Sequence, residues 1–295
     1  MKKIAVTLML FTLLLFATAG VNADQLADIK AAGKIVVGSD TTYPPFEFRD
    51  ASGNIIGFDV DFANELASRL GVTAEIKSVV WDTIIPQLKN GEFDIIISAM
   101  TITEERSQEI DFSIPYYNST QAILVYKGNP WNIQNENDLD QEGLKVGVQI
   151  GTTSDIWATQ NLKKATIVRL DTFDALFPKM NLKELDVILG DLPVVAYAAK
   201  QGTVNGEVVA SFGTPEQFGV GVRKGETNLL NAINNAIKGM LDDGTYDKIF
   251  ADWFGTIGEG GEGTGENGFL SFDLPTVAIG FVFVAIAIPV LRRRN

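Results

Sequence analysis

The sequence predicts an α/β protein with parallel-rich sheets and a chain divided into two lobes. Three observations predict this class. Short β-branched runs alternate with amphipathic helical patterns between residues 35 and 255, an order typical of α/β folds. The alternation begins again after Tyr116 and Tyr117, which indicates a second lobe. The 295 residues, 46% of them hydrophobic, suffice for one large core or two modest ones.

The first lobe opens with a strand at residues 35–37 that leads into a loop, Gly38 to Phe46. Two prolines exclude a helix in this loop, which therefore holds Asp40 and Tyr43 in fixed positions. A helix is expected next, from Gly57 to Leu70, because its apolar residues recur at three-and-four spacing before a terminating glycine.

A second strand and helix follow in the same lobe. The strand is expected at residues 72–79, and Trp81 comes directly after it. A short helix around residues 84–88 comes next, with Asp82 as its expected N-cap and Gly91 as its stop.

The segment Ser98 to Arg106 follows a buried strand at residues 93–97 and therefore lies at its carboxyl end. Thr103 is expected to cap a helix that begins at Glu104, because its hydroxyl can accept a free backbone N–H. Small residues, a hydroxyl, free amides and a guanidinium together suit a small ligand with a carboxylate. The alternative is a solvated arginine on an ordinary strand-to-helix turn.

The second lobe repeats the alternation of strands and helices. Gly151-Thr152-Thr153 begins a helix whose amides suit an anion, and Asp191 ends a strand two residues before Pro193, which suits the first turn of a helix. The expected strands lie at residues 121–126, 145–149, 166–170, 186–189 and 218–222, and the remaining helices near residues 173–180, 227–241 and 246–254.

Composition excludes several classes of function. The chain has no cysteine and no histidine, so disulfides, thiol catalysis, histidine-dependent triads and most zinc sites are excluded. No cofactor and no metal are expected. The net charge of −13 disfavours nucleic acid as a partner and modestly favours cationic solutes, within the limits of salt screening.

Both ends of the chain carry membrane-related patterns. Residues 1–23 are typical of a secretory signal peptide. A Gly/Glu linker at residues 256–268 precedes an expected transmembrane anchor at residues 269–291, whose apolar run 274–291 would span about 27 Å as a helix. The basic tail, residues 292–295, is expected to be cytoplasmic. The alternative is a sorting signal whose tail is cut off and replaced by a lipid.

The sequence contains a pattern that is specific to one protein family. Its strongest part is Gly57-Phe58-Asp59-Val60-Asp61-Phe62, followed by Leu66, Ala67 and Leu70. Further matching segments are residues 40–46, 98–106, 151–153, 190–191 and 244–255. On these residues, the chain from 34 to 255 resembles the family 3 extracellular solute-binding proteins, which are amino-acid receptors of ABC importers.

The resemblance implies a bilobed, periplasmic-binding-protein-like clamp of type II with two crossings between the lobes. Lobe 1 would comprise residues 24–117 and 217–255, and lobe 2 residues 118–216. The implied protein is a monomer without enzymatic activity that binds a free amino acid on the extracellular face of the membrane and delivers it to an ABC transporter permease.

The resemblance also implies roles for individual residues. Arg106 would hold the ligand carboxylate by a two-pronged contact, with Thr101 and the helix start at Thr152-Thr153 completing that site, and Asp191 would hold the ammonium group. The complete expected ligand-binding set is Asp40, Tyr43, Trp81, Ser98, Ala99, Met100, Thr101, Arg106, Gln149, Thr152, Thr153 and Asp191.

Side-chain specificity is expected to come from Tyr43, Trp81, Asp40 and Gln149. An aromatic pair attracts a cation, and Asp40 can pair with a distal positive group or an amide. Arginine, lysine or histidine is therefore expected, with glutamine or another polar amino acid as the alternative. Acidic amino acids are disfavoured because Asp40 would repel them.

Two other functions compete with the transport receptor. A few relatives with this fold dehydrate small acidic metabolites, and Arg106 and Asp191 would serve such a substrate as well. The second competitor is a sensory ectodomain, which would need a separate membrane partner because only residues 292–295 follow the expected span.

Overall fold

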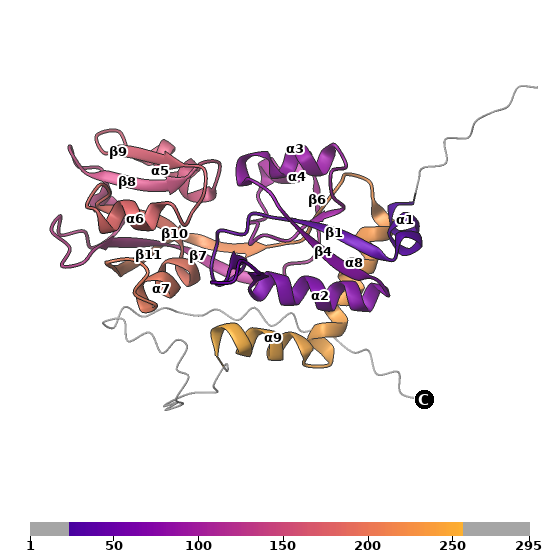
Figure 1. Cartoon of the computed structure of the whole chain (residues 1–295). Helices are drawn as coiled ribbons and strands as arrows, with labels where there is room; N and C mark the ends of the chain where they lie inside the picture. Colours follow the sequence, from indigo (N-terminus) through magenta and orange to yellow (C-terminus); the bar gives the residue numbers. More distant parts are fainter. Residues whose placement is uncertain (1–23, 256–295) are drawn as a thin grey trace, which may run out of the picture.

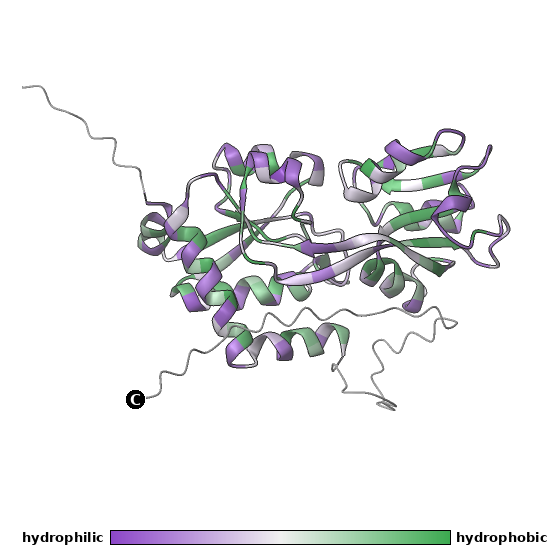
Figure 2. Cartoon of the chain, turned by 180° about the vertical axis from the view of Figure 1, so that it is seen from behind, coloured by the Kyte–Doolittle hydropathy of each residue, from purple (hydrophilic) through white to green (hydrophobic). Residues whose placement is uncertain are grey.

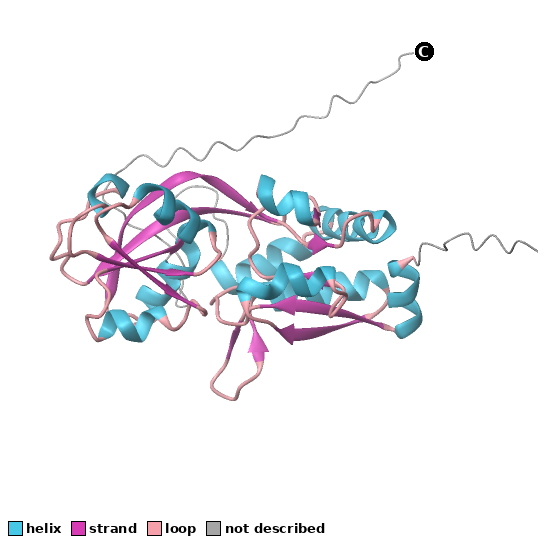
Figure 3. Cartoon of the chain, turned by 90° about the horizontal axis from the view of Figure 1, so that it is seen from above, coloured by secondary structure: helices cyan, strands magenta, loops and turns pink. Residues whose placement is uncertain are grey.

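The computed structural model describes residues 24–255, which form two α/β lobes joined by a pair of long strands (Figure 1, Figure 3). The predicted bilobed α/β class is therefore confirmed. The expected signal peptide (1–23), linker (256–268), anchor (269–291) and tail (292–295) lie outside the described residues. Between residues 24 and 255, no helix is long and apolar enough to cross a membrane.

The first lobe is built on a five-stranded sheet. Its strands, in spatial order, are β4 (Thr73–Ser78), β1 (Lys34–Ser39), β5 (Ile95–Ile96), β12 (Gly221–Val222) and β6 (Asp111–Phe112). β1 runs parallel to both β4 and β5, whereas β12 is antiparallel to β5 and β6. The chain thus returns to this sheet after it has built the second lobe.

Helices surround the first sheet, and a short hairpin extends from the lobe. The helix α2 buries Phe62, Leu66 and Leu70, which confirms the predicted apolar face. The helices are α1 (Gln25–Ala32), α2 (Phe58–Leu70), α3 (Ile84–Lys89), α4 (Glu104–Glu109), α8 (Thr227–Asp242) and α9 (Thr245–Phe254), with a 3-10 turn η1 (Trp81–Thr83) and the hairpin β2 (Phe48–Arg49) and β3 (Ile55–Ile56).

The second lobe contains the other five-stranded sheet, with β8 parallel to β9 and β10 and with β7 antiparallel to β10 and β11. Its strands are, in spatial order, β11 (Gly206–Phe218), β7 (Tyr117–Tyr126), β10 (Val187–Asp191), β8 (Lys145–Gln149) and β9 (Thr166–Leu170). Its helices are α5 (Thr153–Asn161), α6 (Leu176–Asn181), α7 (Leu192–Lys200) and the 3-10 helix η2 (Glu136–Leu139). Figure 2 shows the hydrophobic residues concentrated on the strands and inner helix faces.

An aromatic cluster packs where β7 and β11 leave the first lobe. The ring of Phe46, which is fully buried, lies 4.9 Å from that of Tyr117 and 5.4 Å from those of Phe218 and Phe254 (centroid to centroid). The cluster therefore connects the pocket-forming loop after β1 to both crossing strands and to α9. Aromatic pairs in this geometry each stabilise by roughly 0.5–1.5 kcal/mol beyond their area burial.

Two local predictions are wrong. Asp82 is not the N-cap of a helix, because residues 81–83 form the turn η1 and α3 begins only at Ile84, without a side-chain cap. Most of β11 was not predicted as a strand. Its residues are mainly half-buried or exposed, it is an edge strand, and its pairing is irregular between Phe212 and Glu216, so it lacks the apolar alternation that marks a strand.

Candidate functional site

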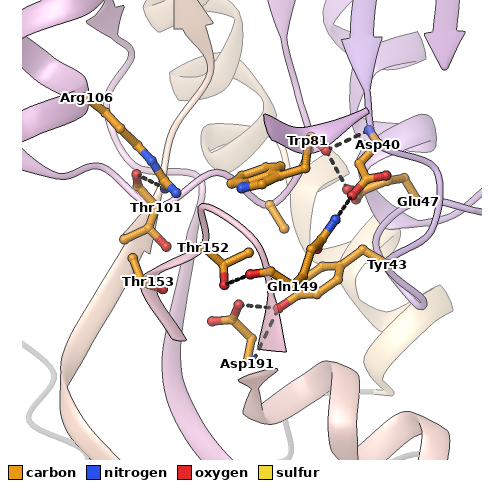
Figure 4. A pocket seen from close by; sticks show the side chains of 12 residues that line it. Asp40, Tyr43, Glu47, Trp81, Thr101, Arg106, Gln149, Thr152, Thr153 and Asp191 are labelled. Carbon is orange, nitrogen blue, oxygen red and sulfur yellow. Dashed lines mark hydrogen bonds between the residues drawn. The ribbon is translucent and has the colours of Figure 1, made fainter. Parts of the chain in front are cut away.

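A pocket lies between the two lobes (Figure 4). It encloses about 300 Å³ of empty space, including its opening to solvent. All the predicted ligand-binding residues except Met100 line it, together with Glu47, which was not predicted. The lining residues are Asp40, Tyr43, Glu47, Trp81, Ser98, Ala99, Thr101, Arg106, Gln149, Thr152, Thr153 and Asp191.

Met100 does not line the pocket, and its predicted place in the site is therefore corrected. Its side chain is fully buried in a hydrophobic cluster with Ile84 and Ile110. Its neighbours Ala99 and Thr101 both line the pocket. Met100 thus points away from the pocket and anchors this segment in the core of the first lobe.

Strand ends from both sheets supply the pocket. Asp40 directly follows β1 and Ser98 lies two residues beyond β5, while Gln149 and Asp191 are the last residues of β8 and β10. Each pair belongs to neighbouring parallel strands, β1 with β5 and β8 with β10. Carboxyl ends of parallel strands meet at one edge of a sheet, which is where open α/β sheets bind ligands.

Arg106 is a buried cation, and no carboxylate among the described residues forms an ion pair with it. Its side chain donates from Nη1 to the carbonyl of Thr101 (2.8 Å) and from Nη2 to that of Gly151 in the other lobe (3.3 Å). The Trp81 ring lies 5.0 Å from its guanidinium carbon. Burial lowers the pKa of Arg106 to about 10, against the opposing charge of Glu216. The group therefore remains charged at neutral pH and attracts an anion.

A helix cap places Arg106 beside the pocket. Thr103 Oγ1 accepts the backbone N–H of Arg106 at 3.2 Å, and Glu104 and Glu105 occupy the first turn of α4. The predicted cap is therefore confirmed. It fixes the start of the helix, and with it the direction in which the arginine side chain leaves the backbone.

Asp191 is the buried acid of the second lobe. Its Oδ2 accepts from the Tyr43 hydroxyl at 2.5 Å, and its Oδ1 from Ser119 at 2.7 Å and from Gln121 at 3.4 Å. Burial and the charge of Glu216 raise the pKa of Asp191 to about 7, although these hydrogen bonds act in the opposite direction. Its side chain makes no capping bond to α7, so it is available to the pocket.

Asp40 and Gln149 form a second contact between the lobes. Gln149 Nε2 donates to Asp40 Oδ2 at 2.5 Å, and the Thr42 hydroxyl donates to Oδ1 at 3.0 Å. The backbone N–H of Asp40 donates to Ser98 Oγ at 2.9 Å. Burial raises the pKa of Asp40 to about 6 despite the hydrogen bonds from Gln149 and Thr42.

The predicted threonines surround a carboxylate that the sequence did not indicate. Thr101 Oγ1 and Thr153 Oγ1 donate to Glu216 Oε2 at 2.6 and 3.1 Å. Thr152 instead caps α5, accepting the N–H of Asp155. Glu216 is half-buried on β11, and no local pattern marks it, because only the pairing of β11 with β7 brings it next to these threonines.

The charged and polar groups of the pocket suit a molecule with separate negative and positive groups. The first lobe contributes the Arg106 cation, the second contributes the Asp191 acid, and hydroxyl and amide groups lie between them. Across residues 24–255, no group of three or more acidic side chains is arranged to hold a metal ion. A zwitterion can therefore bridge the two lobes through its own charges.

Comparison with known proteins agrees with this geometry. Residues 35–256 match the sequence profile of the bacterial extracellular solute-binding proteins, family 3. The chain belongs to this family. The resemblance carried by the Gly57–Leu70 pattern is thereby confirmed.

Several known proteins are similar to this chain over most of their length. The chain is 35% identical over 243 residues to the L-cystine-binding protein TcyJ of Escherichia coli strain K12, covering 80% of this chain and 91% of TcyJ. It is 35% identical over 268 residues to the probable histidine-binding protein of Neisseria gonorrhoeae, covering 89% and 98%. The crystal structure of the ancestral amino acid-binding protein AncCDT-1, a precursor of cyclohexadienyl dehydratase, matches with a TM-score of 0.74 and 43% identity, covering 78% and 99%.

The raised pKa of Asp191 predicts a pH dependence of this family 3 protein without ligand. Its pKa is raised from 3.8 to about 7, so its stabilising contribution is complete below about pH 4 and is lost as the pH rises through about 7. As the pH rises from about 4 to about 8, we expect the free energy of unfolding of the wild type to fall by about 4 kcal/mol more than that of Asp191→Asn. Urea unfolding at a series of pH values measures this difference.

The exposed Asp252 provides the control for this comparison. Asp252→Asn replaces the same chemical group outside the pocket and serves as the matched control variant. Parallel curves for Asp191→Asn and the wild type would show that Asp191 is ionised in the folded protein throughout this range.

Proposed function

We propose that this chain is the amino-acid-binding protein of an ABC importer and that its lobes close around one free amino acid for delivery to a membrane permease. The observation that carries the proposal is the Arg106 guanidinium, which is 9% exposed and lines the pocket without a carboxylate ion-pair partner among the described residues. Membership of family 3 supports the same function, since two similar members are named for binding cystine and histidine.

In the proposed complex, the two charges of the amino-acid backbone contact different lobes. The ligand carboxylate accepts from the planar fork of Arg106, a geometry that the point charge of lysine does not reproduce. The Thr101 and Thr153 hydroxyls, which donate to Glu216 in the structure, are the additional donors beside it. The ligand ammonium group donates to Asp191, whose ionised form it stabilises.

Ligand binding favours closure because each lobe holds one end of the molecule. The two lobes touch through Tyr43 with Asp191 and through Gln149 with Asp40. A ligand adds ionic contacts that exist only when both lobes approach it. Its greater affinity for the closed arrangement is what shifts the protein towards that state.

We propose a cationic side chain for the ligand, as in arginine, lysine or histidine. Asp40 is 4% exposed and its pKa is raised to about 6 by burial, so a cation placed beside it would stabilise its ionised form. Gln149 and the Tyr43 ring lie on the same side of the pocket (Figure 4). Glutamine is the alternative, because an amide can also donate to Asp40, whereas an acidic side chain would be repelled.

Arg106 provides the first test of the proposed function. We expect Arg106→Ala to weaken amino-acid binding by about 100-fold or more, because it removes charge-assisted hydrogen bonds in a buried site. Arg106→Lys should recover only part of the affinity. Thermal unfolding of the purified protein against all twenty amino acids identifies the ligand, since binding to the native state alone raises the melting temperature, and calorimetry gives its dissociation constant.

The control for Arg106 is Arg49→Ala, because Arg49 lies on the exposed end of the β2–β3 hairpin. This variant should bind as the wild type does. An unchanged dissociation constant in Arg106→Ala would remove the central contact of the proposal, and the absence of any thermal shift would count against an amino-acid ligand. Recovery of the bound molecule unchanged distinguishes binding from turnover.

Asp40 provides the test of side-chain class. We expect Asp40→Asn to weaken arginine binding by about 10-fold or more and glutamine binding by less than about 3-fold, because only the cationic ligand loses a charge partner. Calorimetry with both amino acids measures the two losses. Equal losses of affinity for the two amino acids would contradict the proposal that Asp40 contacts a positive group of the ligand.

We further propose that residues 269–291 tether the binding lobes to the outer face of the membrane. The support is the apolar run at residues 274–291 followed by three arginines, a pattern typical of a single span with a cytoplasmic end. The full chain should therefore stay in the membrane fraction until detergent is added, whereas a chain ending at Gly255 should remain soluble. Alkaline washing and immunoblotting of the fractions distinguish the two results.

A further inference from the structure

Glu47, which lines the pocket, and Asp59 are two buried carboxyl groups of the first lobe. Glu47 is 0% exposed and Asp59 is 1% exposed, and the two groups lie close enough for their charges to interact. Glu47 Oε2 and Asp59 Oδ1 are buried and have no hydrogen-bond partner among the described residues. Two ionised carboxylates have no proton to share, so a hydrogen bond between these two oxygens needs one of the pair to be a neutral acid.

The backbone brings the two groups together at the start of α2. The N–H groups of Phe58 and Asp59 donate to the carbonyls of Pro45 and Phe46 at 3.0 and 2.9 Å, so the loop and the helix start lie in direct contact. Gly57 permits this approach, since its φ is 140° and a Cβ there would lie 2.0 Å from the Phe46 carbonyl oxygen.

The surroundings decide which group carries the proton. Asp59 accepts from the Ala99 N–H at 2.7 Å and from the Tyr116 hydroxyl at 2.9 Å, and it lies in the first turn of α2, where the helix dipole favours a negative charge. Glu47 accepts one other bond, from Ser98 Oγ at 2.7 Å. Burial raises the pKa of Glu47 well above its ordinary value and that of Asp59 only to about 6. The proton therefore resides on Glu47.

The pair holds two consecutive residues of the pocket wall. Glu47 accepts the hydroxyl proton of Ser98, and Ser98 Oγ in turn accepts the N–H of Asp40. Asp59 accepts the N–H of Ala99, which has a φ of 43°, a left-handed conformation that is uncommon outside glycine. The positions of Asp40, Ser98 and Ala99 thus all depend on these two carboxyl groups.

We propose that Glu47 is a positioning residue of the binding site, held as a neutral carboxylic acid that donates a hydrogen bond to the Asp59 carboxylate and thereby fixes the Ser98–Ala99 wall and Asp40. This role rests on the proposed amino-acid binding but concerns a residue without an assigned contact to the ligand. The other titratable groups that influence the pair are Asp40 at the end of β1, Tyr116 before β7 and Tyr246 on α9.

Two substitutions at Glu47 separate hydrogen bonding from charge. Glu47→Leu removes both bonds and leaves a buried oxygen of Asp59 unpaired, so ligand affinity should fall by about 10-fold or more. Glu47→Gln can donate from its amide to Asp59 and accept from Ser98, so it should recover most of that affinity. Calorimetry with the amino acid that stabilises the wild type measures both. A Glu47→Gln variant as weak as Glu47→Leu, or a Glu47→Leu variant with wild-type affinity, would overturn the proposal.

The protonation state is measured directly by infrared spectroscopy. The spectrum of the wild type minus that of Glu47→Gln at neutral pH should contain the C=O stretch of a protonated carboxyl group. A difference spectrum with only carboxylate bands would overturn the proposal. This measurement needs no ligand, so it remains decisive if no amino acid binds and the proposed function fails, and equally if Glu47→Leu does not fold.

The pH dependence of unfolding gives an independent readout. Because the pKa of Glu47 is raised in the folded state, its stabilising contribution is present below its ordinary pKa of 4.5 and is lost as the pH rises through the folded value. The melting temperature of the wild type should therefore fall relative to that of Glu47→Gln as the pH rises. A difference that stays constant with pH would show that Glu47 is not held as an acid.

Discussion

The burial of one guanidinium group, that of Arg106, is the constraint around which the pocket is arranged. A charge removed from water must be compensated, yet the nearest acceptors of Arg106 are two backbone carbonyls, one from each lobe, rather than a carboxylate. The Trp81 ring against it limits its access to water. The first lobe therefore presents to the space between the lobes a positive charge without a carboxylate ion-pair partner among the described residues, and a ligand carboxylate is the partner that the proposed function supplies.

Two acidic side chains of the pocket, Asp40 and Asp191, complement the positive charge of Arg106, because they can bind the positive groups of a ligand. Asp40 and Asp191 are each almost fully buried, and burial raises the pKa of each towards neutrality. These groups accept hydrogen bonds from neutral donors, Gln149 and Tyr43, that come from the opposite lobe. A cationic group offers either acid a stronger partner than a hydroxyl or an amide. The same contacts that join the two lobes thus mark where, in the proposed function, the positive groups of a ligand would bind.

Behind these charges, a packed framework fixes the pocket wall. Phe46 lies at the centre of the aromatic cluster between the lobes, and the next residue, Glu47, reaches Ser98 and Asp59. One loop thereby connects the crossing strands, the start of α2 and the end of β5. Since protein interiors are closely packed, a small displacement of this loop would be transmitted to the pocket wall. In our proposal, the neutral acid Glu47 is the group through which this connection acts.

The sequence by itself determined the α/β class, the two lobes, the family and most of the pocket, because strand ends, helix caps and the pattern from Gly57 to Leu70 are local signals. The cap at Thr103, for example, requires only neighbouring residues. Only the tertiary structure decided that Met100 points into the core, because side-chain direction depends on a backbone conformation such as the left-handed Ala99. It also decided that Glu47 lines the pocket and that Glu216 contacts the pocket residue Thr101, since both positions depend on residues distant in the chain.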